Sequence, residues 1–339
     1  MECKRNCNRN RAGAGASREQ CRKAGRGFRS PSRSAPAAAS AAGLHHGRRA
    51  LAGLGCGGRL SGDRIPGRET LLKTAKQISA NGVTVNYEIG GLDSGPWVVF
   101  SHSLGCSKAM WQPQFDALAK SYRVLRYDIR GHGASSTPPA PYSLDMMAQD
   151  VKALCDALNI EKCHFVGLSM GGMIGQTVAL NHPELLLSLT LADTSSHYGP
   201  DLMPFWEARS QTALMQGMTP LVAPSLERWF TAPFRAAHPV LMQEAMQWVL
   251  DTPSQGYAAC CMAIAVIDTT ARLKEIKVPA QVIVGKDDLA TPPAMSELIH
   301  ARIAGSKLLV LESAAHISSV EQARKFTDAL QGFLAGVPA

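Results

Sequence analysis

The stretch from residue 163 to residue 176 is the part of the sequence that most constrains the fold. A short apolar, β-branched run enters it and a helix-compatible segment leaves it, and between them stands a G-x-S-x-G pattern of Gly167, Ser169 and Gly171. A serine in a sharp strand-to-helix turn adopts a strained backbone, and glycine at the flanking positions leaves room for the neighbouring strand and helix. The pattern alone is common, so a glycine-rich turn with an idle serine is the alternative interpretation. The strand–turn–helix setting is what makes Ser169 a candidate nucleophile.

Short apolar runs with strand character alternate with helix-compatible segments along most of the chain. The runs lie at residues 83–88, 97–100, 124–128, 163–166, 187–192, 281–285 and 307–311. The Asn81-Gly82 dipeptide before the first run predicts an N-terminal β-hairpin, and Ser143 is placed to cap a helix over the following apolar positions. The alternation predicts an α/β fold, with a mainly parallel sheet covered by helices on both faces.

The strand pattern stops between about residues 195 and 272. Aromatic residues and methionines are frequent there, and prolines divide the segment into short helical pieces. Two interpretations apply together: a helical subdomain with its own core, and a lid that supplies an apolar substrate pocket. We therefore expect an α/β core in two parts, residues 71–194 and 273–339, with a helical cap at 195–272 inserted between them and a disordered basic extension at 1–70.

The positive net charge of the chain belongs to this N-terminal extension. Residues 1–70 contain 15 Lys and Arg against four acids, which leaves 20 basic and 23 acidic residues in 71–339. The folded body is thus mildly acidic, and we expect no nucleic-acid partner. No apolar run approaches the roughly 18 residues that a membrane helix needs, so we expect no membrane association either. The extension itself is interpreted as disordered, as the product of a start codon assigned too far upstream, or as an organelle transit peptide.

The nine cysteines do not form a disulfide or zinc-binding pattern. Five of them lie in apolar, core-like surroundings, and no pair of C-x-x-C units occurs. We expect free thiols, no metal or other cofactor, and a reducing, cytoplasmic compartment. The oligomeric state stays open.

Three candidate catalytic groups follow three predicted strands in the order serine, acid, histidine. Ser169 follows the run at 163–166, Asp287 and Asp288 follow 281–285, and His316 follows 307–311. Because the carboxyl ends of parallel strands meet at one edge of a sheet, these side chains can come together. The order matches a nucleophile, a carboxylate and a base, in which the histidine removes the serine proton and the carboxylate fixes its tautomer.

Asp288 is the preferred acid, and Asp193 at the end of an earlier strand is its main rival. The oxyanion that forms in acyl transfer needs two N–H donors, for which we predict the backbone amides of Met170 and Leu104. His102 and His132 are expected to brace loops rather than act as bases. A serine where other enzymes carry an aspartate nucleophile favours acyl transfer over dehalogenase or epoxide hydrolase chemistry.

Residues 78–334 resemble the α/β-hydrolase family, and within it they are most similar to the 3-oxoadipate enol-lactonases. The elbow and the Arg-Gly-His-Gly loop at 130–133 are shared widely, whereas the motifs around Trp229 and Tyr257 are much narrower. The stretches that carry the resemblance are residues 103–105, 126–135, 167–176, 228–231, 233–235, 256–261 and 290–293. The resemblance implies a small-molecule substrate, an enol-lactone bearing a carboxymethyl group, that is opened to 3-oxoadipate in aromatic-compound breakdown (the β-ketoadipate pathway).

One position departs from the family pattern. His197 stands where family members often carry Lys or Arg, which weakens the case for the same anionic substrate if this position contacts the carboxylate. Arg209, close to Trp206 in the predicted cap, could compensate. The candidate substrate-binding residues are therefore Trp206, Arg209, Trp229 and His197. The alternatives are a carboxylesterase, a carbon–carbon bond hydrolase, or a ligand-binding hydrolase fold without catalytic activity.

Overall fold

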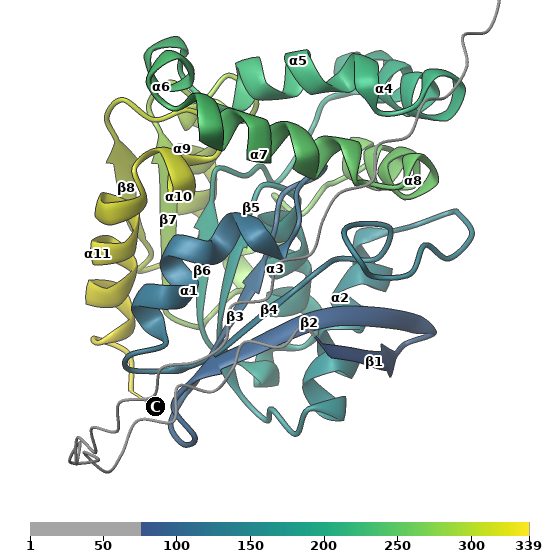
Figure 1. The fold of residues 1–339 in the computed structure, drawn as a ribbon. Coiled ribbons are helices and arrows are strands. Elements are labelled where there is room, and N and C mark those ends of the chain that lie inside the picture. The colour runs from purple at the N-terminus through teal and green to yellow at the C-terminus, as the bar shows by residue number, and fades with distance from the viewer. Residues whose placement is uncertain (1–75, 339) are drawn as a thin grey trace, which may run out of the picture. The chain divides into compact units, whose positions relative to one another are not determined.

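The computed structural model describes residues 76–338, so the predicted extension at 1–70 lies outside the described residues. One eight-stranded sheet, in the order β1-β2-β4-β3-β5-β6-β7-β8, forms the centre of the fold (Figure 1). The pairs β1–β2 and β2–β4 are antiparallel, and all other neighbouring strands are parallel. The predicted mainly parallel α/β sheet is thereby confirmed. The strands are β1 (Lys76–Ala80), β2 (Val83–Gly91), β3 (Trp97–Ser101), β4 (Arg123–Tyr127), β5 (Cys163–Leu168), β6 (Leu186–Ala192), β7 (Ala280–Gly285) and β8 (Lys307–Leu311).

Helices cover both faces of the sheet. Helices α1 and α11 pack together on one face, while α2, α3 and α9 lie against the other (Figure 1). The α-helices are α1 (Gln112–Leu118), α2 (Leu144–Ala157), α3 (Met170–Asn181), α4 (Met203–Gln216), α5 (Thr219–Trp229), α6 (Ala232–Ala237), α7 (Pro239–Leu250), α8 (Ser254–Ala265), α9 (Pro293–Arg302), α10 (Ser318–Glu321) and α11 (Ala323–Leu334). Short 3-10 helices are η1 (Lys108–Trp111), η2 (Pro183–Leu185), η3 (Pro200–Leu202) and η4 (Leu273–Glu275).

Two local predictions from the sequence are confirmed. Asn81 and Gly82 both have positive φ, 48° and 72°, and form the tight turn between β1 and β2. The Ser143 hydroxyl accepts a hydrogen bond from the Met146 amide at 3.1 Å and caps α2. Asparagine and glycine are favoured in tight turns with positive φ, and serine is favoured at the N-terminal cap of a helix.

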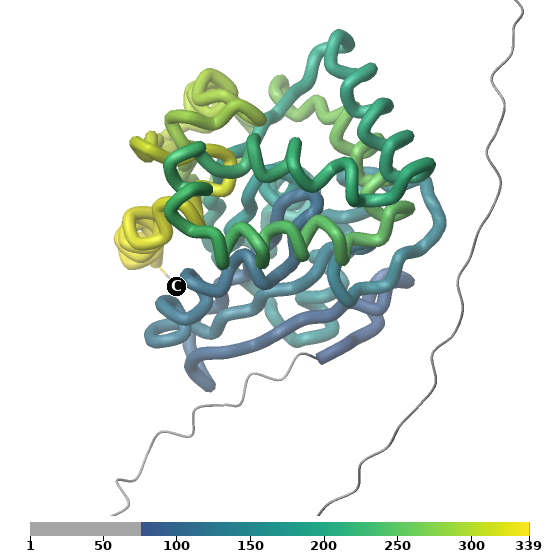
Figure 2. The backbone as a smooth tube through the Cα atoms, turned by 45° about the horizontal axis from the view of Figure 1, so that its top comes forward, coloured from purple at the N-terminus to yellow at the C-terminus, as the bar shows by residue number. Residues whose placement is uncertain are grey.

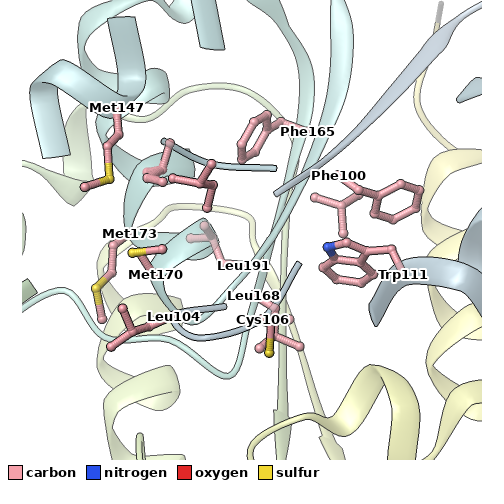
Figure 3. Packing of buried hydrophobic residues seen from close by; sticks show 14 of the residues in the cluster. Phe100, Leu104, Cys106, Trp111, Met147, Phe165, Leu168, Met170, Met173 and Leu191 are labelled. Carbon is pink, nitrogen blue, oxygen red and sulfur yellow. The ribbon is translucent and has the colours of Figure 1, made fainter. Parts of the chain in front are cut away.

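The core lies on both sides of the central strands. Every residue of β3 and β5 is buried, as expected for strands that are covered by helices on both faces. Phe100 of β3 packs on Trp111, with ring centroids 4.8 Å apart, and Trp111 packs in turn near Phe326 of α11. Figure 3 shows Phe100 and Trp111 on one side of the sheet and the side chains of Met147 and Met173 on the other. This packing fixes the central strands and, with them, the loops at their ends.

Helices α4 to α8 form a cap between β6 and β7 (Figure 2). The cap contacts loops at the carboxyl ends of the strands: the Trp229 carbonyl accepts a hydrogen bond from Ile317 after β8, and Gly256 lies against Gly131 after β4. The cap therefore covers the edge of the sheet where the candidate catalytic residues lie. Among residues 76–338, no helix is both long and apolar enough to span a membrane.

Candidate active site

Ser169 lies in the sharp turn between β5 and α3. Its backbone has φ 56° and ψ −116°, and its amide donates a hydrogen bond to the Ala192 carbonyl at 2.9 Å. A Cβ on Gly171 would lie 2.1 Å from the Ser101 carbonyl oxygen, and one on Gly167 would lie 2.1 Å from the carbonyl oxygen of Gly171. Both distances are far below contact distance, so glycine is required at both positions. The strained turn is packed closely against neighbouring backbone on both flanks, and it places the serine side chain at the start of the helix.

Ser169, His316 and Asp288 form a continuous hydrogen-bonded line. His316 Nε2 lies 2.9 Å from Ser169 Oγ, and His316 Nδ1 lies 2.9 Å from Asp288 Oδ2. Asp288 also accepts hydrogen bonds from the Ala290 amide and from the amide and hydroxyl of Thr291, at 2.7 to 2.9 Å. The structure thus brings together the serine, the histidine and the preferred acid in the arrangement that nucleophilic catalysis uses.

The environment of Asp288 keeps it ionised. Burial alone would raise the pKa of this carboxyl, but the neighbouring His316 and the hydrogen bonds donated by Thr291 outweigh burial and lower the pKa below its ordinary value. A carboxylate at this place holds the Nδ1–H tautomer of His316, which leaves Nε2 free to accept the serine proton.

The two other candidate acids do not contact His316. Asp287 is exposed. Asp193 is fully buried, and its carboxyl oxygens accept hydrogen bonds from the Gly285 amide at 2.8 Å and the Ser318 hydroxyl at 2.5 Å. Burial, followed by the nearby charge of Asp288, raises the pKa of Asp193 well above its ordinary value. Asp193 therefore joins the loops that follow β7 and β8 and leaves the contact with His316 to Asp288.

The two predicted oxyanion donors lie where a reacting carbonyl can meet them. Met170 is the first residue of α3, so its N–H has no acceptor within the helix. The N–H of Leu104 has no hydrogen-bond acceptor among residues 76–338. Leu104 lines the same pocket as Ser169, and Met170 directly follows Ser169 at the start of the helix.

Two buried histidines hold the loop that contains Leu104. His102 Nε2 accepts a hydrogen bond from the Ile129 amide at 2.9 Å, and its Nδ1 lies 2.8 Å from the Ser103 carbonyl oxygen. His132 Nε2 accepts a hydrogen bond from the Gly105 amide at 3.0 Å. Burial lowers the pKa of both imidazoles, that of His132 to about 3, so they stay neutral. The ring nitrogens of both histidines thus contact backbone groups of the loops around the site.

The hydrogen-bonded line of Ser169, His316 and Asp288 opens on a small pocket, of about 40 Å³, between the core and the cap. Three of the predicted substrate-binding residues, Trp206, Arg209 and Trp229, are part of its wall. The fourth, His197, is not brought to the pocket: its side chain is 47% exposed, and its ring lies 3.6 Å from the Asp268 carboxylate. The full lining is Ser103, Leu104, Ser169, Met173, Phe205, Trp206, Arg209, Ser225, Arg228, Trp229, Tyr257, Ile264, Ala290 and His316.

Arg228 is the charged pocket residue to which the sequence assigned no role. It is half-buried on α5, and its guanidinium lies over the ring of Phe205, 4.8 Å from the centroid. The one signal in the sequence was its place in a stretch, 228–231, that resembles the enol-lactonases. Arg209 and Arg228 give the pocket two cations.

Comparison with known proteins agrees with this geometry. A family model for the alpha/beta hydrolase fold matches residues 96–323. The 3-oxoadipate enol-lactonase 2 of Acinetobacter baylyi is 38% identical over 257 residues, which cover 76% of this chain and 95% of that protein. The putative carbamate hydrolase RutD of Pseudomonas syringae is 31% identical over 246 residues, covering 72% and 95%.

A solved structure leads to the same family. The crystal structure of the enol-lactonase from Burkholderia xenovorans has a TM-score of 0.74 and 39% identity, and the match covers 77% of this chain and all of that chain. The matching family model, these relatives and the serine turn between β5 and α3 agree, and the chain belongs to the α/β hydrolase family.

Proposed function

We propose that this enzyme hydrolyses a small enol-lactone that carries a carboxylate, of the 3-oxoadipate enol-lactone type, and releases 3-oxoadipate. The observation that carries the proposal is the hydrogen-bonded line Ser169–His316–Asp288, which opens on a small pocket that also contains Arg209 and Arg228. The line supplies acyl-transfer chemistry, and the two arginines favour an anionic substrate over a neutral ester. The names of the Acinetobacter and Burkholderia relatives support the choice of lactone.

In the first half of the reaction, Ser169 Oγ attacks the lactone carbonyl carbon while His316 Nε2 takes the hydroxyl proton. The carbonyl oxygen becomes an oxyanion, which the N–H groups of Leu104 and Met170 stabilise, each by about 3 kcal/mol of barrier. Collapse of this intermediate breaks the ring carbon–oxygen bond and leaves an acyl group on Ser169. The ring oxygen is expelled as an enolate that stays attached to the acyl chain. It takes up the proton held by His316 and becomes a ketone by tautomerisation, so His316 is neutral again.

In the second half, water attacks the acyl group on Ser169, which still carries the newly formed ketone on the same chain. His316 removes a proton from the water, the resulting hydroxide attacks the acyl carbon, and the same two amides hold the new oxyanion. The bond to Ser169 Oγ then breaks, Oγ regains its proton from His316, and the acid is released. Because an enolate is a good leaving group, acylation of the serine needs little acid assistance, and orientation of the small substrate and deacylation become the demanding steps.

A comparison of substrates tests the proposal. The enzyme is assayed with 3-oxoadipate enol-lactone, the methyl ester of that lactone, p-nitrophenyl acetate and a simple carbamate. We expect kcat/KM for the anionic lactone to exceed that for the neutral compounds by at least about a hundredfold, since one charge-assisted contact contributes roughly 1.5–3 kcal/mol and ring orientation adds to it. Equal rates on the neutral esters would indicate a general carboxylesterase, and a preference for the carbamate would indicate the chemistry that the RutD relatives are named for.

We also propose that the reaction takes place in the cytoplasm. The five cysteines of the described region, Cys106, Cys155, Cys163, Cys260 and Cys261, are buried free thiols, which a reducing compartment preserves.

A further inference from the structure

Two arginines from different cap helices meet at the same aromatic ring. Arg209 on α4 and Arg228 on α5 place their guanidinium carbons 5.6 Å and 4.8 Å from the centroid of the Phe205 ring. Both line the pocket that contains Ser169. Neither forms an ion pair with an acidic residue within residues 76–338. No acidic residue of the described protein is therefore paired with either cation in this part of the pocket.

The donors of Arg209 are directed at other side chains. Its Nε donates to the Tyr257 hydroxyl at 2.9 Å, and its Nη2 donates to the same oxygen and to the Ser225 hydroxyl. Tyr257 is buried, and a Cβ on Gly105 would lie only 3.2 Å from its ring, so the ring packs directly on the loop that carries Leu104. Arg209 thus fixes the position of Tyr257 against the predicted oxyanion loop.

The guanidinium of Arg228 has no such partner. It forms no hydrogen bond with any acceptor among the described residues, although it is half-buried against the ring of Phe205. Burial, and then the positive charge of Arg209, lowers the pKa of Arg228 from its ordinary value. A guanidinium with unused donors and no ion-pair partner is stabilised when a carboxylate enters, because the fork of N–H groups matches the two carboxylate oxygens.

We infer that Arg228 binds the carboxylate of the substrate and determines the preference for an anionic lactone, whereas Arg209 is a positioning residue that acts through Tyr257. This assignment rests on the proposed function for the identity of the substrate. The carboxylate lies on the cap side of the pocket, and the lactone carbonyl lies at Ser169 on the core side. The two ends of the substrate are thereby held by different layers of the fold.

Kinetics on paired substrates test the division of roles. The variants are Arg228→Gln, Arg228→Lys and Arg209→Gln, with Arg302→Gln as the control because Arg302 is an exposed arginine on α9. We expect Arg228→Gln to raise KM for the anionic lactone about ten- to a hundredfold with a much smaller change in kcat, and to reduce the ratio of kcat/KM between the lactone and its methyl ester by the same factor. Arg228→Lys keeps a charge but loses the fork, so it should restore part of the ratio.

Arg209→Gln should behave differently. Loss of its bonds to Tyr257 disturbs the oxyanion loop, so kcat should fall by a similar factor on the lactone and on the methyl ester, and the ratio should stay near its wild-type value. The inference is overturned if Arg228→Gln leaves the ratio unchanged, or if Arg209→Gln is the variant that lowers it.

Binding of adipate, a dicarboxylate without an ester, separates this inference from the proposed function. Calorimetry should show that adipate binds the wild-type enzyme and the Arg302→Gln control equally, and Arg228→Gln at least about tenfold more weakly. If no lactone is hydrolysed but this loss of binding is observed, the proposed function fails and the role of Arg228 stands. If the lactone is hydrolysed and adipate binds Arg228→Gln as well as wild type, the role of Arg228 fails and the proposed function stands.

Discussion

Asp288 Oδ2 lies 2.9 Å from His316 Nδ1, although Asp193 is buried beside the same two loops. Asp288→Asn would remove the acceptor that holds the His316 tautomer, and we expect kcat/KM on the lactone to fall about a thousandfold or more. Asp193→Asn should lose much less, because its contacts are to Gly285 and Ser318. If Asp288→Asn kept nearly the wild-type kcat/KM while Asp193→Asn lost most of it, the catalytic acid would be Asp193.

The raised pKa of Asp193 predicts a specific dependence of stability on pH. Above about pH 4 the unfolded carboxyl is ionised while the buried one keeps its proton, so the folded state binds more protons and the free energy of unfolding falls as pH rises toward the folded pKa. Asp193→Asn removes this contribution, and the stability of wild type relative to the variant should decrease steadily from about pH 4 upward. Chemical denaturation across pH measures it, with the exposed Asp287→Asn as the control. A difference that does not vary with pH would mean that Asp193 is ionised in the folded enzyme.

Gly171 tests the packing of the serine turn. Because a Cβ there would lie 2.1 Å from the Ser101 carbonyl oxygen, which is backbone, Gly171→Ala should destabilise the fold by about 2–4 kcal/mol and displace Ser169. Gly332→Ala is the matched control, since that position on α11 has open space around it and alanine favours a helix by roughly 0.5–1 kcal/mol. Thermal unfolding of the two variants should therefore shift in opposite directions, and equal melting temperatures would contradict the close approach of α3 to β3.

His197 lies outside the pocket, in a bridge to Asp268. We therefore expect His197→Ala to leave the ratio of kcat/KM between the anionic lactone and its methyl ester within about twofold of wild type, far from the tenfold that losing a charge-assisted hydrogen bond causes. A tenfold drop in that ratio would indicate that His197 reaches the substrate during turnover.

Much of the fold can be predicted from the sequence, because the structure that each short segment favours is the one it adopts in the complete fold. The short runs at 97–100 and 163–166 lie in strands buried on both faces. Asn81-Gly82 and Ser143 lie at the turn and the helix cap that their chemistry favours. The order of strand ends along the chain likewise predicts that Ser169, Asp288 and His316 can meet. These features depend on short stretches and on the general rule that parallel strands end at one edge of a sheet.

The cap is less readable, because its pocket depends on how helices pack on one another. Arg209 and Arg228 belong to two helices whose relative placement no periodicity in the sequence specifies. Only the packing of α4 against α5 and α8 shows that Arg209 donates hydrogen bonds to Tyr257 while Arg228 does not. His197 illustrates the same limit: its position after β6 is readable, but the bridge to Asp268 that directs it away from the pocket comes from a residue 71 positions later.

The central claim is that Ser169 opens a carboxylate-bearing enol-lactone, and the turnover of 3-oxoadipate enol-lactone by wild type and by Ser169→Ala tests it most directly. The wild-type enzyme should hydrolyse the lactone rapidly, and Ser169→Ala should keep the wild-type melting temperature yet lose at least about a thousandfold in kcat, since only the oxyanion donors and binding remain. The account would be contradicted if the wild-type enzyme did not hydrolyse the lactone. It would also be contradicted if a folded Ser169→Ala retained more than about a tenth of the wild-type rate, because removing a nucleophile costs orders of magnitude.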